Sequence, residues 1–314
     1  MFARSPGVSR DADHEWVETR QDAKVKLLLS DDLGFPTMGG VVLKAEIPVD
    51  WHTGEHTHGE EAIHVVSGTG FVLVDGHRFD IRPGSTIGIP YRAAHQLVNT
   101  GDTPVQYVSA LALPLERFVK IGQLEQLQDC GPNTDELLTV APEAGHALPG
   151  GRRVIIHLDE APTYADQDLD ATPAAYQNQH GEAHFLMTHD NGFRMPNSVA
   201  MTHVFEEPPF HHGGRHKHLE AVLYVLDGEG HSDVQGEQKP WVTGDVLHIP
   251  SAMYEHEHFN KCDRTSRMLR IQFGIRYWFT DIWSEGYRPR RVYTETGDPM
   301  VSGPNPAGTP DIRG

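Results

Sequence analysis

The chain has 314 residues, with 26 Lys and Arg against 44 Asp and Glu, and so carries a formal charge of −18. This charge argues against nucleic acid and anionic membranes as partners, because their phosphates would be repelled. No apolar run approaches the roughly 18 residues that span a bilayer, and the N-terminus lacks the apolar core of a signal peptide. The chain has only two cysteines, Cys130 and Cys262, which is too few for a framework of disulfides. We therefore expect a cytoplasmic protein.

Histidine is unusually abundant, with 21 copies, and many of them fall in an internal repeat. The segment 46–70, EIPVDWHTGEHTHGEEAIHVVSGTG, aligns without a gap on 206–230, EEPPFHHGGRHKHLEAVLYVLDGEG. A second block, 82–99, aligns on 242–260 with one extra residue in the second copy. Chance would not return both blocks at one offset, so the chain is two copies of one unit.

Residues 1–115 form the first predicted unit. His56 and His58 are two residues apart in a strand-like segment, so their imidazoles point to the same face. His95, about 37 residues further on, would close one triangular face of a metal ion and leave other positions open. Short runs such as GFVLVDG, bounded by glycine and aspartate, predict strands in a closed antiparallel sandwich or barrel.

Residues 116–195 are expected to form a linker with a short helix and to include the start of the second unit. LERFVKIGQLEQLQDC has apolar residues at helical spacing and predicts a short helix. The residues concerned are Phe118, Ile121, Leu124 and Leu127. The segment HLDEAPTYADQDLDATPAAYQNQHGEAH is acidic and interrupted by prolines, which predicts a surface connection.

Residues 196–290 form the second unit, and its candidate ligands are His216, His218 and His256. His258 shares the strand face of His256 and is an alternative ligand. His256 is preferred because it keeps the three-residue gap to Asn260 that separates His95 from Asn99.

The segment SRMLRIQFGIRYWF places Arg270 and Gln272 on one face of a predicted strand. Arg270 is the candidate to bind a substrate carboxylate, since guanidinium groups pair with carboxylates in a bidentate manner. A surface salt bridge is the alternative. An aromatic group further along is expected to pack between subunits of a homo-oligomer: Tyr277, Trp278, Phe279, Trp283 and Tyr287. Residues 291–314 are expected to form an irregular tail.

Three further pairs recur in both copies: His52/His212, Glu60/Glu220 and Asn99/Asn260. We interpret the histidine pair as polar residues near the barrel mouth, with hydrogen bonding behind the ligands as the alternative. The glutamates are interpreted as exposed or histidine-orienting carboxylates. The asparagines are expected to make a backbone hydrogen bond that shapes a turn.

These blocks resemble the cupin superfamily, whose motifs are G(X)5HXH(X)3–4E(X)6G and G(X)5PXG(X)2HXXXN. The resemblance covers about two thirds of the chain. It implies an all-β bicupin with two tandem double-stranded β-helix (jelly-roll) barrels and a short helical linker. In copy one, Glu61 follows His58 one residue earlier than the pattern, and is a candidate fourth ligand. In copy two, Ala221 stands at the aligned place.

A three-histidine site without the glutamate is similar to the gentisate 1,2-dioxygenase-like bicupins. This resemblance implies a non-haem Fe(II) dioxygenase that uses O2 to cleave a hydroxylated aromatic or related enolic acid, such as gentisate or salicylate. Neutral imidazoles suit Mn, Ni, Cu and Zn as well. The alternatives are a quercetinase-like or isomerase-like enzyme with a 3His/1Glu site in copy one, and a non-catalytic bicupin that binds a small molecule.

Overall fold

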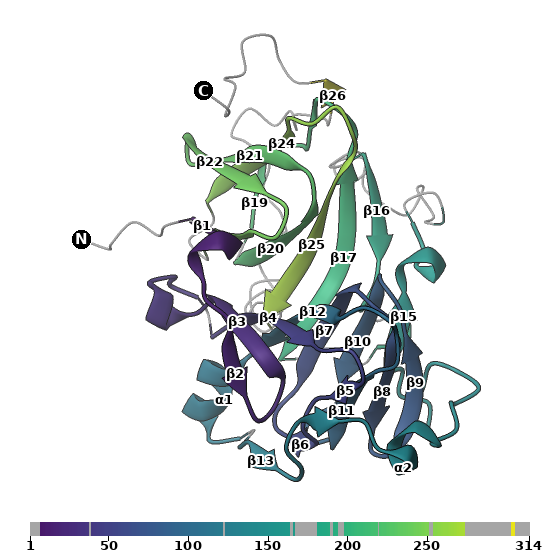
Figure 1. Ribbon diagram of the computed structural model, residues 1–314. Coiled ribbons are helices and arrows are strands. Elements are labelled where there is room, and N and C mark those ends of the chain that lie inside the picture. The colour runs from purple at the N-terminus through teal and green to yellow at the C-terminus, as the bar shows by residue number, and fades with distance from the viewer. Residues whose placement is uncertain are drawn as a thin grey trace.

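The computed structural model describes residues 7–37, 39–121, 123–163, 166, 181–188, 191–193, 198–218, 220–250, 254–273 and 303–304. Two antiparallel barrels follow each other along the chain. Figure 1 shows the purple to teal strands of barrel 1 below the green strands of barrel 2. The predicted all-β fold of two tandem barrels is confirmed.

Barrel 1 is built from two sheets. The first has the order β15-β10-β7-β12-β4-β3-β2. Its strands are β2 (Val17–Thr19), β3 (Ala23–Leu29), β4 (Val41–Ile47), β7 (Glu61–Ser67), β10 (Ser85–Ile89), β12 (Val105–Leu111) and β15 (Ile155–His157). In the second, β13-β6-β11-β5-β14, strand β11 also pairs with β8, and β8 with β9. Its strands are β5 (Trp51–His52), β6 (His56–Thr57), β8 (Gly70–Val74), β9 (His77–Ile81), β11 (His95–Asn99), β13 (Glu125–Gln126) and β14 (Gly131–Pro132).

Barrel 2 repeats this plan. Its first sheet has the order β1-β23-β20-β25-β17-β16. The strands are β1 (Val8–Ser9), β16 (Glu182–Phe185), β17 (Val199–Glu207), β20 (Ala221–Asp227), β23 (Val246–Ile249) and β25 (Ser266–Phe273). The second sheet has the order β22-β21-β24-β18-β26, with β19 paired to β24. Its strands are β18 (His211–His212), β19 (His216–Lys217), β21 (Glu229–Val234), β22 (Glu237–Val242), β24 (Glu255–Asn260) and β26 (Gly303–Pro304).

Strand pairing crosses the domain boundaries expected near residues 115 and 195. Strand β1, at the N-terminus, pairs with β23 of barrel 2, where Val8 lies opposite Leu247. Strand β15, from the expected linker, pairs with β10 of barrel 1, where His157 lies opposite Ser85. Strands of two or three residues carry too little periodicity to be assigned to a sheet from sequence alone.

The central strands carry buried apolar side chains on both faces. On β7, Ile63 and Val65 point into the core of barrel 1. Ala62 points outward and belongs to a cluster that Val222 and Ile271 of barrel 2 share. The two barrels are therefore joined by an apolar cluster separate from the two barrel interiors, because each barrel presents an apolar outer face that must be removed from water.

The linker contains the predicted short helix, but not at the predicted place. Helix α1 spans Leu113–Val119 and ends at Lys120, whose φ of 60° is left-handed; α2 spans Asp135–Leu138. Phe118 is 83% exposed and Ile121, Leu124 and Leu127 are also exposed, so their spacing does not mark a buried face. The predicted helix therefore extends too far along the chain, because the chain leaves the helix at Lys120, and Glu125–Gln126 pairs with β6 instead.

Other features bear on the remaining expectations. None of the helices among the described residues is long and apolar enough to cross a membrane. Cys130 and Cys262 are free thiols. The aromatic group at 277–287 lies outside the described residues, as does most of the tail, of which Gly303 and Pro304 pair with β18.

His64 links pH to stability. It lies on the outer face of β7 and is 2% exposed, with Nδ1 2.8 Å from Thr86 Oγ1. Burial lowers its pKa from 6.5 to about 4. The unfolded chain takes up this proton first, so its contribution to stability is present above pH 6.5 and is lost as the pH falls toward 4. We expect a loss of about 2 kcal/mol between pH 7 and pH 5 from this residue alone.

Urea unfolding at both pH values measures this contribution. His64→Gln keeps a polar side chain but cannot titrate, so its stability should change with pH by about 2 kcal/mol less than that of the parent protein. Equal pH dependence in the two proteins would show that His64 is not responsible.

Candidate metal centres

Barrel 1 gathers three buried imidazoles. His56 lies on β6, His58 follows that strand, and His95 begins β11, directly opposite His56. The ring centroids lie 4.3 to 5.1 Å apart, and the ligand nitrogens all lie within 4.8 Å of one another. The structure thus brings together the three histidines of copy one that the sequence predicted as ligands.

Backbone carbonyls orient these rings. The Nδ1 atoms of His56, His58 and His95 each lie 3.0 Å from a carbonyl oxygen, those of Gly54, Gly59 and Ala93. A carbonyl only accepts hydrogen bonds, so each Nδ1 carries the proton and each neutral ring keeps its lone pair on Nε2. Histidine ligands of metals are commonly held in this way.

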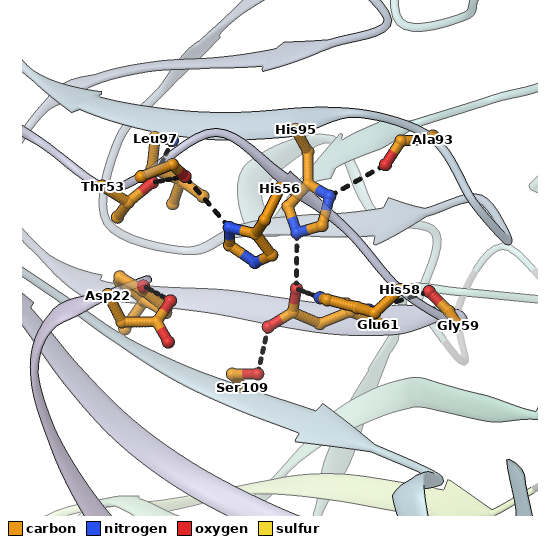
Figure 2. Close-up of polar contacts among 12 residues, drawn as sticks. Asp22, Thr53, His56, His58, Gly59, Glu61, Ala93, His95, Leu97 and Ser109 are labelled. Carbon is orange, nitrogen blue, oxygen red and sulfur yellow. Dashed lines mark hydrogen bonds and ion pairs between the residues drawn. The ribbon is translucent and has the colours of Figure 1, made fainter. Parts of the chain in front are cut away.

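Glu61 joins the group from β7. Its Oε2 lies 3.2 Å from Nε2 of His95 and 3.4 Å from Nε2 of His58, while Ser109 donates to Oε1 (Figure 2). Because Nδ1 holds the proton in both rings, lone pairs of nitrogen and oxygen face one another. Only a proton or a cation between them makes this arrangement favourable, so the donor set fits a divalent metal.

The electrostatics agree with a cation at this place. Burial raises the pKa of Glu61, but His58 and His95, which in their protonated forms donate from Nε2 to the carboxylate and attract it, outweigh burial and hold the pKa below its usual value. Burial lowers the pKa of His58, but Glu61 outweighs it and raises the pKa overall. Both pKa shifts show that a positive charge beside the Glu61 carboxylate is favourable.

Barrel 2 gathers the second predicted set, His216, His218 and His256. Their ring centroids lie 4.5 to 5.1 Å apart, and Nε2 of His218 lies 3.2 Å from Nε2 of His256. Nδ1 of His216 donates to Gly214 O at 2.7 Å, and Nδ1 of His256 to Tyr254 O at 2.8 Å. The same orientation by carbonyls recurs in the second copy.

The environment of the second set differs in charge. By register, Ile63 lies opposite Ser109 in barrel 1, and its repeat equivalent Leu223 lies opposite Arg270 in barrel 2. Arg270 therefore takes the place of Ser109, and Ala221 that of Glu61. One barrel has a carboxylate held by a hydroxyl where the other has a methyl group and a guanidinium.

Arg270 and Gln272, the predicted substrate-binding residues, are 5% and 7% exposed. Arg270 is thus not on the surface, and its charge acts on His258 inside the barrel. His258 itself does not join the triad: its Nδ1 lies 2.7 Å from Ser232 Oγ. Burial holds the pKa of His258 well below its usual value, with the charges of His256 and Arg270 adding to the effect.

The remaining repeated pairs have other contacts. Glu60 accepts from Arg152 and from the backbone of Ser198, whereas Glu220 lies 2.7 Å from His248 Nε2. His52 and His212 are buried, with each Nδ1 directed at the next residue's carbonyl. The asparagine amides bind several backbone carbonyls around a turn.

Two residues of the barrel-1 site were missed from the sequence. Tyr107, on β12, is fully buried, and its hydroxyl donates to Asp22 Oδ1 at 2.9 Å. Asp22 lies in the turn between β2 and β3. Figure 2 shows its side chain near His56 and Glu61. Neither Tyr107 nor Asp22 belongs to a repeated block, so no sequence signal singled them out.

A third group, His146, His157 and Glu160, has potential ligand atoms within 4.8 Å of one another. The side chains of His146 and Glu160 are 40% exposed, and Arg82 lies 3.6 Å from Glu160. Because this guanidinium competes with a cation for the carboxylate, we do not count the group among the candidate centres.

Comparisons with known proteins agree with this architecture. Residues 43–111 match the family model described as "Cupin domain". The uncharacterized protein MJ1618 of Methanocaldococcus jannaschii is 32% identical over 65 residues, 20% of this chain and 52% of that protein. The chain thus spans about half the length of the curated relative that it matches.

Solved structures match over most of the chain. Salicylate 1,2-dioxygenase from Pseudaminobacter salicylatoxidans is 18% identical, with a TM-score of 0.60, covering 85% of this chain and 78% of that one. Oxalate decarboxylase from Bacillus subtilis is 13% identical, with a TM-score of 0.64, covering 87% and 77%. The chain therefore shares the tandem-barrel fold of these solved structures, and residues 43–111 of barrel 1 match the cupin domain. Its architecture resembles that of the salicylate 1,2-dioxygenase, which has also been solved with gentisate, in line with the bicupin architecture that the sequence motifs predicted.

Proposed function

We propose that this protein is a metal-dependent dioxygenase that uses Fe(II) and O2 to cleave a hydroxylated aromatic acid of the gentisate or salicylate type. The metal would be held by His216, His218 and His256. The observation that carries the proposal is the convergence of three buried imidazoles in a barrel that also buries Arg270. The fold shared with a salicylate 1,2-dioxygenase supports it.

The residues of barrel 2 divide the work of such a reaction. When bound, Fe(II) supplies the redox chemistry that O2 needs and acts as a Lewis acid toward the substrate. Three neutral imidazoles would leave the charge of the dication uncompensated, which would favour the binding of a substrate with an anionic phenolate and carboxylate. Arg270 would pair with the carboxylate and Gln272 would donate to it, which orients the ring. The apolar walls keep water from the reacting groups.

Metal analysis and oxygen uptake test the proposal. We expect the purified protein to contain about one or two equivalents of iron and to consume O2 when gentisate or salicylate is added. If the protein holds no metal and chelation does not lower its thermal stability, the non-catalytic binding protein becomes the better description, since a ligand that binds only the native state must stabilise it.

A second candidate function belongs to barrel 1. The position of Glu61 Oε2, facing Nε2 of both His58 and His95, favours a 3His/1Glu centre with quercetinase-like or isomerase-like chemistry. Abolition of O2 uptake by His58→Ala, with the metal of barrel 2 still present, would favour this candidate over the first.

We also propose a cytoplasmic location and a homo-oligomeric state. Free Cys130 and Cys262 suit a reducing compartment. Several exposed apolar side chains of the linker suit burial between subunits: Phe118, Val119, Ile121, Leu124 and Leu127.

A further inference from the structure

The two candidate centres have opposite electrostatic surroundings, although the same repeat builds them. Glu61 and Ser109 of barrel 1 correspond to Ala221 and Arg270 of barrel 2. All four side chains are buried, so their charge or lack of charge acts in a medium that screens it poorly. A ligand suited to one barrel should therefore be disfavoured in the other.

A second carboxylate strengthens this contrast in barrel 1. Tyr107 belongs to the barrel-1 core and is fully buried, and its hydroxyl donates to Asp22 Oδ1 at 2.9 Å. The carboxyl group of Asp22 therefore lies against a buried hydroxyl of the barrel-1 core. Figure 2 shows its carboxyl group turned toward His56 and Glu61. Burial raises the pKa of Asp22 to about 6, and the charge of Glu61 adds to the rise.

The turn that carries Asp22 is held over the barrel by backbone hydrogen bonds. Gly54 N donates to Gln21 O at 2.6 Å, and Cys130 N donates to Arg20 O at 3.0 Å. Gly54 also precedes the first ligand, His56, whose ring its carbonyl orients. The position of Asp22 is therefore coupled to the strand that carries the metal ligands.

The contacts of Asp22 leave one oxygen for a ligand. Within the described part of the chain, Tyr107 is the one side chain that donates to this carboxylate, and it does so to Oδ1. Oδ2 can accept a hydrogen bond from a hydroxyl group of a ligand bound in barrel 1. In barrel 2, Met268 takes the place of Tyr107 by register, so no such dyad recurs there.

We propose that barrel 1 is a second ligand site, which takes a neutral molecule bearing hydroxyl groups and recognises it through Asp22, while barrel 2 takes the carboxylate ligand. The inference rests on the proposed function for the metal of barrel 2, and adds that the three histidines and Glu61 of barrel 1 hold a metal as well. Glu61 neutralises part of the charge of the dication, and Asp22 repels a carboxylate. Both effects select an uncharged diol or phenol over an aromatic acid.

Calorimetric titration of the Co(II)-loaded full chain with catechol and with salicylate tests this division. Co(II) replaces Fe(II) so that no turnover disturbs the measurement, and metal content is determined for every variant. We expect Asp22→Asn to weaken catechol binding tenfold or more and to leave salicylate binding unchanged. Arg270→Ser should have the reverse effect.

A second variant of the same pair of residues tests whether the effect of Asp22→Asn is purely structural. Tyr107→Phe removes one oxygen atom from a buried ring, retains the packing, and should weaken catechol binding without altering salicylate binding. Catechol affinity that is unchanged in both Asp22→Asn and Tyr107→Phe, or salicylate binding that falls equally in them, overturns the inference. Failure of the parent protein to bind Co(II) at all would instead overturn the proposed function.

Discussion

Replacing His218 by alanine is expected to remove the metal of barrel 2 and to lower oxygen-consuming activity on aromatic acids about 10³-fold, equivalent to ~4 kcal/mol of transition-state stabilisation. His218 Nε2 lies 3.2 Å from His256 Nε2, so both nitrogens are close enough to bind the same metal ion. Two remaining imidazoles cannot close the triangular face that holds the ion. Metal content per chain, measured beside O2 uptake, checks the result.

Two variants serve as controls. His58→Ala should remove only the metal of barrel 1, and His77→Ala should change neither metal content nor activity, because His77 pairs with Glu143 on the surface. If His218→Ala keeps full activity while losing one metal equivalent, barrel 2 is not the catalytic barrel. Full activity in His58→Ala would then be incompatible with the second candidate function as well.

Asn99→Ala and Asn260→Ala are each expected to destabilise the fold by about 3 kcal/mol. Both asparagines are fully buried. Nδ2 of Asn260 binds the carbonyls of Glu207, Pro208 and Arg264 at 2.8 to 3.0 Å, and its Oδ1 accepts from Cys262 N at 2.8 Å. Alanine would leave these backbone groups buried without their partner, which costs more than the hydrogen bonds themselves contribute. Urea unfolding measures the difference.

The matched control is Thr103→Ala, in the same loop as Asn99. Asn99 Nδ2 binds the backbone carbonyl of Thr103 at 2.9 Å, whereas the Thr103 side chain is exposed. This control should lie within about 0.5 kcal/mol of the parent protein. A loss below 1 kcal/mol in both asparagine variants would mean that water replaces the amide, and that the repeated asparagine does not hold the turn together.

The duplicated pattern in the sequence was sufficient to predict the barrels and the two histidine groups. His56 and His58 share a strand face because side chains alternate along extended chain. The repeat then assigned His95 and His256 to equivalent strands, and the structure places each beside its pair. The preference for His256 over His258 followed from the gap to Asn260, and the structure gathers His256, not His258, with His216 and His218.

Local patterns failed where tertiary pairing overrode them. The apolar spacing from Phe118 to Leu127 predicts a helical face, yet the helix ends at Val119 because Lys120 turns into the left-handed region. The strand at Val8–Ser9 pairs with barrel 2, which is the more distant barrel in sequence. A strand of two residues is too short for its periodicity to predict such a pairing. In both cases the energy comes from contacts with residues far along the chain, which a local window does not contain.

The sequence by itself determined that this protein is two β-barrels, each with three histidines able to meet at one point, because strand alternation and internal repetition are properties of the order of residues. Only the tertiary structure decided what surrounds each point. Strand register sets Glu61 and Ser109 in one barrel against Ala221 and Arg270 in the other. Packing of the N-terminal hairpin brings Asp22 to Tyr107. These contacts depend on how segments distant in sequence pack together, and such packing produces no periodic pattern in the sequence.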